Sequence, residues 1–195
     1  EVSIVADKFA EPDLIAADLI AQAEHDVNAQ SILITNNLNF IQLVNLSLKK
    51  QLIKLPKKKI ASKSLKNFGL AILAGSKKKI LEAINTIAPE HLELCTNMNK
   101  QIIKGVKNAG SIFIGKFSPE AIGDYMAGPN HVLPTSGSAR FSSGLSVNDF
   151  LKRHSLIKIT KTGIERLGSS VINLAQHENL DGHANSIRIR LKKEY

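Results

Sequence analysis

The 195-residue chain contains no tryptophan, one cysteine and no long apolar run. The single cysteine, Cys95, cannot support an internal disulfide framework, so we expect a cytoplasmic protein. A membrane-spanning helix needs about 18 consecutive apolar residues, and no run reaches that length. The chain also has no charged-then-apolar leader. We therefore expect neither a membrane segment nor a secretory signal.

Acidic residues are missing from one long stretch, because no Asp or Glu lies between Asp26 and Glu82. Lysines crowd this stretch, and the net charge of the chain is +9. Nucleic-acid surfaces favour arginine for bidentate contacts and aromatic side chains for stacking, whereas this stretch has lysines and only Phe40 and Phe68. A solvated lysine-rich helix face explains the charge more simply, so we expect no nucleic-acid partner. A basic nucleic-acid-binding module remains an alternative, which a salt-dependent DNA or RNA titration would distinguish.

Strand-like and helical patterns alternate along the first 115 residues. Apolar runs predict strands at 2–6, 30–35, 68–73, 91–95 and 110–115. Helical spacing predicts helices over 12–25, from Asn36 or Asn37 to 55, over a lysine-rich segment before 68, over 76–87 and over 100–106. Continuous apolar strands alternating with helices are typical of an α/β fold with a largely parallel sheet.

The pattern changes after Gly115. A short helix is expected to begin at 118–120, and an irregular passage follows to Gly144. A loop of this length inside a domain is either functional or disordered, and Asp124 and His131 within it favour function. Beyond it we expect a strand over 156–160 and helices over 161–176 and 181–193. These elements have too little apolar surface for a core of their own. We therefore predict an α/β domain over 1–144 and a C-terminal strand and helical tail over 145–195, which packs on the domain or on another subunit.

Several polar residues could carry chemistry. Gln22 and His25 stand three apart near the end of the first predicted helix, so an amide oxygen and an imidazole could reach one metal ion. A helix that ends in solvated polar residues is the alternative. Glu90 and His91 follow Ala88-Pro89 at the start of a strand, where both side chains can line a crevice.

Further histidines and carboxylates lie in the irregular passage and the tail. They are Asp124, His131, His177, Glu178 and His183. Imidazole and carboxylate groups suit zinc. Their spacing alone does not establish a metal site, because each residue taken singly could be an ordinary polar side chain.

Longer motifs make the sequence recognisable. They are the segments 1–7, 16–25, 88–92 (APEHL), 108–113 (NAGSIF), 123–125 (GDY), 128–135 (GPNHVLPT) and 149–153 (DFLKR). In this order, over the whole chain, they resemble the C-terminal portion of the histidinol dehydrogenase family. The resemblance implies that a substrate-contacting serine would lie just before Glu1 and that most of the NAD-binding segment lies further upstream. Together with the start at Glu1 on a strand pattern, this predicts a fragment with an incomplete Rossmann-like layered domain.

The resemblance also implies a function in histidine biosynthesis. Family members oxidise L-histidinol to L-histidine through L-histidinaldehyde, using NAD twice and a zinc ion. By position, the zinc ligands would be Gln22, His25, Asp124 and His183. The acid–base pair would be Glu90 and His91. The substrate contacts would be Gln22, His25, His91, Asp124, His131, Glu178 and His183.

The family is a homodimer that exchanges its C-terminal tails, so Glu178 and His183 would complete the partner subunit's site. His91 is then the expected general base, because imidazole titrates near neutral pH. Glu90 is expected to activate the water that attacks the aldehyde. As an alternative, the chain would be a non-catalytic C-terminal fragment that folds, dimerises and binds zinc weakly without turnover.

Overall fold

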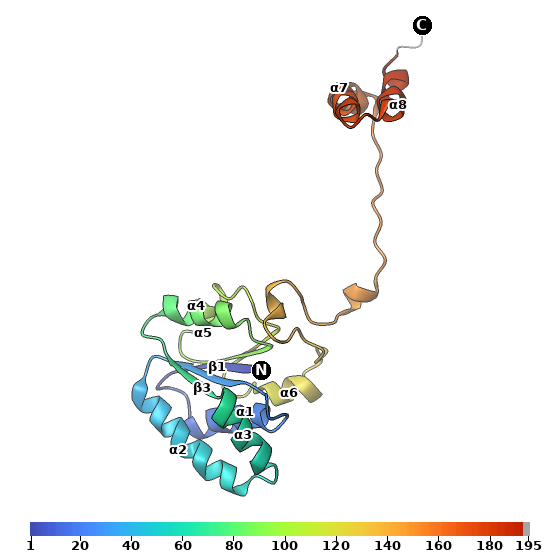
Figure 1. The fold of residues 1–195 in the computed structure, drawn as a ribbon. Coiled ribbons are helices and arrows are strands. Elements are labelled where there is room, and N and C mark those ends of the chain that lie inside the picture. Colours follow the sequence, from blue (N-terminus) through green and yellow to red (C-terminus); the bar gives the residue numbers. More distant parts are fainter. Residues whose placement is uncertain (193–195) are drawn as a thin grey trace. The chain divides into compact units, whose positions relative to one another are not determined.

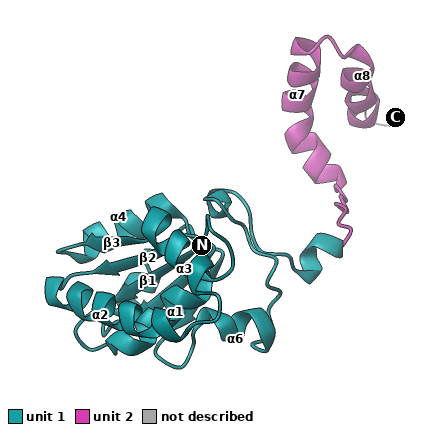
Figure 2. Cartoon of the chain, turned by 60° about the horizontal axis from the view of Figure 1, so that its bottom comes forward, with its two compact units in different colours: residues 1–150 teal, residues 151–195 magenta. Residues whose placement is uncertain are grey.

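The computed structural model describes residues 1–192. The chain forms two compact units, residues 1–150 and 151–195 (Figure 2). The short 3-10 helix Val147–Phe150 lies within the first unit, whereas the predicted boundary falls after Gly144. The roles predicted for the two parts stay predictions. No helix among the described residues is long and apolar enough to cross a membrane.

A five-stranded parallel sheet forms the centre of the first unit. Its strands are β1 (Val2–Ala6), β2 (Ser31–Thr35), β3 (Leu70–Leu73), β4 (His91–Cys95) and β5 (Ser111–Ile114). They lie in the order β3-β2-β1-β4-β5, and every neighbouring pair is parallel. This is the order of the first five strands in a Rossmann fold. The predicted α/β class with a parallel sheet is confirmed.

Helices connect the strands, and their ends follow local sequence signals. They are α1 (Pro12–Ala23), α2 (Leu38–Lys54), α3 (Lys58–Phe68), α4 (Lys77–Ile87), α5 (Asn99–Ile103) and α6 (Glu120–Tyr125). The side chain of Asn37 accepts a hydrogen bond from the Phe40 amide and caps α2, and Ser76 caps α4 in the same way. Pro12 occupies the first turn of α1, where its missing N–H costs nothing.

The helices cover both faces of the sheet (Figure 1). On one face, Ile4 of β1 packs with Leu19 of α1 and Phe40 of α2. On the other, Ile84 of α4 packs with Leu92 of β4 in a second buried cluster that includes residues of α5. Side chains alternate along a strand, and Cys95 packs against the first cluster. The side chains of residues 91 and 93 therefore share the face that α1 covers.

The second unit holds two helices, α7 (Lys161–His177) and α8 (Asp181–Leu191), which pack against each other. Lys193, the predicted end of the last helix, lies outside the described residues. The predicted strand at 156–160 is wrong. Residues 151–160 have no regular structure, and Leu156 is 95% exposed. Their apolar pattern alone cannot make a strand, because a strand requires a hydrogen-bonded neighbour.

Candidate active site

His91 is the centre of the candidate site. As the first residue of β4, it lies opposite Val2 of β1 and Ser111 of β5, at the amino ends of the strands. Its amide donates a hydrogen bond to the Glu1 carbonyl at 3.1 Å. The side chain is 6% exposed and tilts against the Phe113 ring, with 5.9 Å between ring centroids. Most Rossmann folds bind ligands at the carboxyl ends of the strands, so this site lies at the opposite edge.

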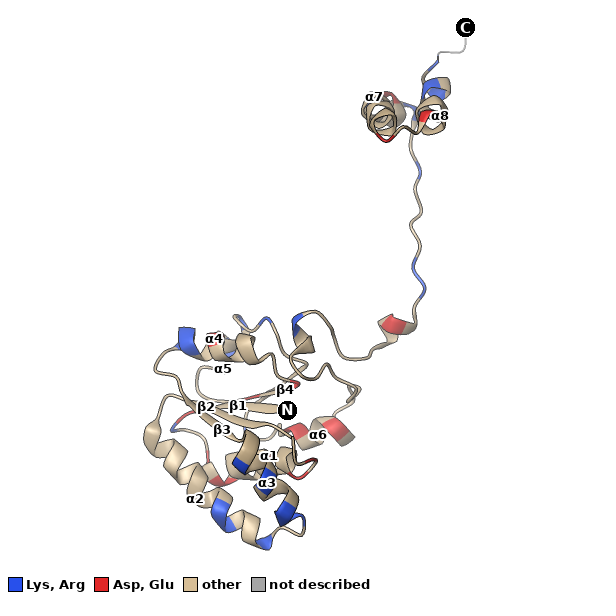
Figure 3. Cartoon of the chain, in the orientation of Figure 1, with Lys and Arg blue, Asp and Glu red and all other residues tan. Residues whose placement is uncertain are grey.

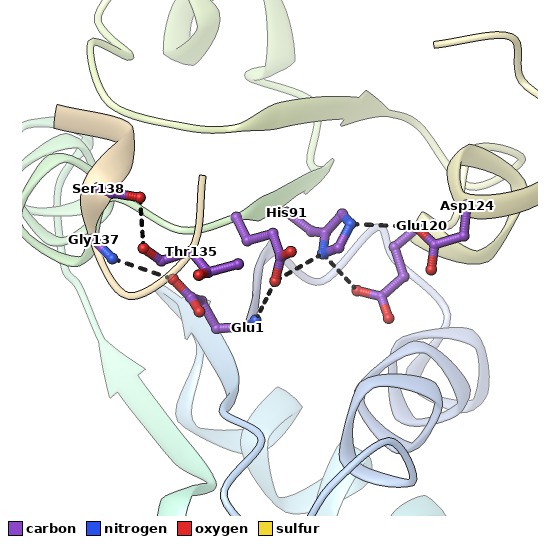
Figure 4. Close-up of polar contacts among 8 residues, drawn as sticks. Glu1, His91, Glu120, Asp124, Thr135, Gly137 and Ser138 are labelled. Carbon is purple, nitrogen blue, oxygen red and sulfur yellow. Dashed lines mark hydrogen bonds and ion pairs between the residues drawn. The ribbon is translucent and has the colours of Figure 1, made fainter. Parts of the chain in front are cut away.

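Three carboxyl groups surround the imidazole (Figure 4). Nδ1 lies 3.7 Å from Glu120 and 3.9 Å from Glu90, and Nε2 lies 3.5 Å from Asp124. These separations are charge contacts, longer than ordinary hydrogen bonds. Neither ring nitrogen has a hydrogen-bond partner among the described residues.

Burial lowers the pKa of His91, and the nearby Glu90 and Asp124 carboxylates oppose that shift only in part. Burial disfavours the charged imidazolium because the interior replaces water around the ring. His91 is therefore neutral near pH 7, with one ring nitrogen free to accept a proton. This is the state that a general base requires.

A cavity of about 600 Å³ opens beside this cluster. His91, Phe113, Asp124 and His131 are among its lining residues. The volume lies within the range of about 300–1,000 Å³ that is usual for small-molecule sites. The structure therefore brings His91, Asp124 and His131 to one cavity, and Glu90 joins them through its contact with His91.

The remaining predicted metal ligands are not gathered in this way. Gln22 is buried in the last turn of α1, but the helix ends at Ala23 and His25 lies in the exposed turn that follows. The expectation that one helix carries both side chains is therefore wrong, because the chain turns at Glu24 and His25. Helix α1 lies next to α6, which carries Asp124. Within residues 1–192, no three His, Cys, Asp or Glu side chains form a group that could hold a metal ion.

Two predicted residues belong to the second unit. Glu178 follows the last residue of α7, and His183 lies in the first turn of α8. Both side chains are exposed. Their assignment to the metal and to the substrate stays a prediction.

Sequence reasoning missed two buried carboxyls beside His91. The Glu93 side chain accepts a hydrogen bond from the Glu120 amide at 2.7 Å, and the two residues are 1% and 2% exposed. Burial raises the pKa of Glu93 to about 9, with Asp18 nearby adding to the shift, and raises the pKa of Glu120 to about 8. The signal for Glu93 was available, because a glutamate inside an apolar strand two residues after His91 must share its face.

A second cavity, of about 370 Å³, lies toward the carboxyl ends of β4 and β5. Phe9, Asp18, Glu93, Thr96 and Lys116 are among its lining residues. Rossmann folds bind dinucleotide phosphates in this region, at a glycine-rich turn after the first strand. Here that turn reads Asp-Lys-Phe-Ala-Glu and contains no glycine.

Basic and acidic residues concentrate on different elements of the first unit (Figure 3). Helices α2 and α3 carry lysines and no Asp or Glu, whereas α6 carries acidic residues and no lysine. The lysine-rich surface thus lies on helices other than the one that carries Glu120 and Asp124. The absence of a nucleic-acid partner stays a prediction.

Known proteins provide an independent comparison. A family model described as histidinol dehydrogenase matches residues 1–191. The chain is 52% identical over 194 residues to histidinol dehydrogenase of Pelagibacter ubique, covering 100% of the chain and 45% of that protein. It is 47% identical over 192 residues to the enzyme of Clostridium acetobutylicum, covering 98% and 44%. A crystal structure of histidinol dehydrogenase from Elizabethkingia anophelis matches 97% of the chain and 44% of its own, with a TM-score of 0.91 and 39% identity. The chain thus spans less than half the length of these relatives.

Proposed function

This chain belongs to the histidinol dehydrogenase family, and we propose that the protein it forms part of oxidises L-histidinol to L-histidine through L-histidinaldehyde. The observation that best supports this proposal is the buried, neutral His91 at a cavity, with carboxyl groups facing both ring nitrogens. Such an arrangement suits proton removal from an alcohol bound in the cavity.

His91 would act as the general base in both oxidations. Its imidazole accepts the hydroxyl proton as the carbon gives up a hydride, first from the alcohol and then from the aldehyde hydrate. Burial keeps the ring uncharged before each step, so it can accept a proton at neutral pH. The nearby Glu90 and Asp124 carboxylates stabilise the imidazolium that forms.

Glu90 would remove a proton from the water that attacks the aldehyde carbon and so forms the hydrate. Its side chain is 17% exposed, more than the 7% of His91. Partial exposure gives this carboxylate access to water from the site. The two neighbouring residues thereby take separate roles.

The donor atoms on this chain fit a zinc ion in their chemistry. Gln22, His25, Asp124 and His183 would offer one amide oxygen, one carboxylate and two imidazoles, which are ligands that zinc accepts. Asp124 supports this assignment, since it lines the same cavity as His91 and His131. When bound, zinc would hold the amino and imidazole nitrogens of histidinol and so fix the alcohol carbon.

NAD would accept the hydride in each oxidation, and we propose that it binds mainly to the part of the protein upstream of Glu1. The acidic, glycine-free turn region after β1 supports this view, because it offers no cradle for a pyrophosphate. The cytoplasmic location expected from the single cysteine also stays a prediction.

The second unit would serve a neighbouring subunit. We propose a homodimer in which Glu178 and His183 of one chain reach the site of the other. The exposed apolar side chains of α7 and α8, among them Leu174 and Ile189, support a role in contacts with another surface.

The experiment measures zinc content and NADH formation with L-histidinol, on the full-length protein and on this 195-residue chain. The proposal predicts NADH formation and about one zinc per subunit in the full-length protein. If the 195-residue chain alone folds and dimerises without turnover, it is the non-catalytic fragment of the alternative. A full-length protein that forms no NADH from histidinol contradicts the proposal.

A further inference from the structure

Two buried polar atoms without partners face each other behind the catalytic cavity. They are Nδ1 of His91 and Oε2 of Glu120, which lie 3.7 Å apart. Neither has a hydrogen-bond partner among the described residues. Buried polar atoms almost always form hydrogen bonds, so such a facing pair calls for a physical explanation.

Glu120 is held firmly in this position. It is the first residue of α6, and its amide donates a hydrogen bond of 2.7 Å to Glu93 of β4. Glu93 lies two residues after His91 on the same strand and is 1% exposed. The strand that carries the imidazole therefore also anchors the helix end that carries the facing carboxyl.

Glu90 is the other carboxyl near Nδ1, and it is less suited to hold the ring. Its Oε2 lies farther from Nδ1, at 3.9 Å. Its side chain is also the more exposed, at 17% compared with 2% for Glu120. Glu90 is therefore the carboxylate that can reach water. No other function has been assigned to the buried Glu120 carboxyl.

We propose that Glu120 is a positioning residue, whose carboxylate accepts a hydrogen bond from Nδ1–H of His91 and so leaves Nε2 as the proton-accepting atom. This inference rests on the proposed function. Nε2 faces Asp124, which lines the cavity, so the proton would move on the substrate side of the ring. Orienting carboxylates of this kind fix the tautomer and direction of a catalytic histidine. Burial raises the pKa of Glu120 to about 8, whereas a hydrogen bond from Nδ1–H favours the carboxylate form. The proposed arrangement is therefore fully formed above about pH 8.

The test compares Glu120→Gln and Glu120→Leu with the wild type in the full-length protein. An amide can donate to Nδ1 and favour the other tautomer, and leucine removes the acceptor altogether. We expect kcat for histidinol oxidation to fall by about 10- to 100-fold, as for other orienting partners, while KM for histidinol and zinc content stay unchanged. A merely structural role would not separate kcat from KM in this way.

Asp7→Asn is the matched control. Asp7 is 5% exposed and accepts hydrogen bonds from the Asn97 amide at 3.3 Å and from the Thr96 hydroxyl, at the carboxyl end of β1. The same acid-to-amide change at this buried site should lower the melting temperature and leave kcat intact. An equal loss of kcat in Asp7→Asn, or an unchanged kcat in Glu120→Leu, overturns the proposal.

The protonation of the His91 ring can be measured directly in the wild-type protein, so this test does not depend on the folding of a variant. Long-range ¹H–¹⁵N NMR at about pH 9, above the pKa of Glu120, on wild-type protein with labelled histidine reports which nitrogen of His91 carries the proton. A proton on Nδ1 supports the proposal, and a proton on Nε2 refutes it. A wild type that forms no NADH from histidinol would instead refute the proposed function, so the two failures are distinguishable.

Discussion

Glu93 offers a prediction in which burial and neighbouring carboxyl groups both disfavour the charged form of one side chain. Its carboxyl is 1% exposed in the middle of β4, with Asp18 and Glu120 nearby. Burial, reinforced by Asp18, raises its pKa to about 9. The substitution Glu93→Gln keeps the side-chain shape and an oxygen that can accept the hydrogen bond from the Glu120 amide. It removes the ionisable group.

The sign of the effect follows from proton linkage. An unfolded glutamate loses its proton near its ordinary pKa of 4.5, whereas the folded one keeps it until about pH 9. The folded state therefore binds more protons, and the stabilising contribution present below pH 4.5 is lost as pH rises toward 9. One proton corresponds to about 1.4 kcal/mol of unfolding free energy per pH unit. Between pH 6 and 8, the free-energy advantage of Glu93→Gln over the wild type should grow by about 1.4 kcal/mol per pH unit.

Urea unfolding at several pH values measures this difference. Far-UV circular dichroism is the suitable probe, because the chain has no tryptophan. Glu82→Gln, at an exposed position of α4, makes the same chemical change without the burial. Its stability curve should run parallel to that of the wild type. If the Glu93→Gln curve also runs parallel between pH 6 and 8, Glu93 is ionised in the folded protein and the reasoning fails.

Two further predictions concern the residues beside the cavity. In the full-length protein, His91→Asn should impair both oxidations, whereas Glu90→Gln should mainly slow conversion of aldehyde to acid; equal rates of histidinaldehyde oxidation in wild type and Glu90→Gln would refute this division. In Gly110→Ala, the new Cβ would lie 2.5 Å from the Glu90 carbonyl oxygen, so unfolding should become easier by about 1–3 kcal/mol with a loss of activity. Gly75→Ala is its control, because a Cβ there meets nothing within 4 Å. Equal melting temperatures of the two variants would show that the close contact at Gly110 does not destabilise the fold.

Much of the fold was predictable because its signals are local. Each apolar run that pairs in the sheet was recognised as a strand, since a strand buried on both faces reads as a continuous apolar run. The caps at Asn37 and Ser76 marked helix starts in the same direct way. The run at 156–160 is also mostly apolar, but it has no neighbour to pair with. Pairing is a tertiary property, so the sequence of that segment could not reveal its absence.

The site was only partly predictable for a similar reason. The motif around Glu90 and His91 predicted an acid–base pair, and the structure places His91, Asp124 and His131 at the same cavity. The contact of Glu120 with His91 depends on the start of α6 being held at β4 by the hydrogen bond from the Glu120 amide to Glu93. The sequence of residues 118–120 contains no local signal that predicts this contact. The end of α1 at Ala23 was missed because Glu24 and His25 carry no glycine or proline stop signal.

We propose that His91 and Glu90 supply the acid–base groups of a histidinol-oxidising site. This is tested by the amount of NADH that the full-length protein forms from a limiting amount of L-histidinol. We expect two NADH for each histidinol consumed, with histidine as the product. Formation of no NADH, or of one NADH with histidinaldehyde as the final product, would contradict it.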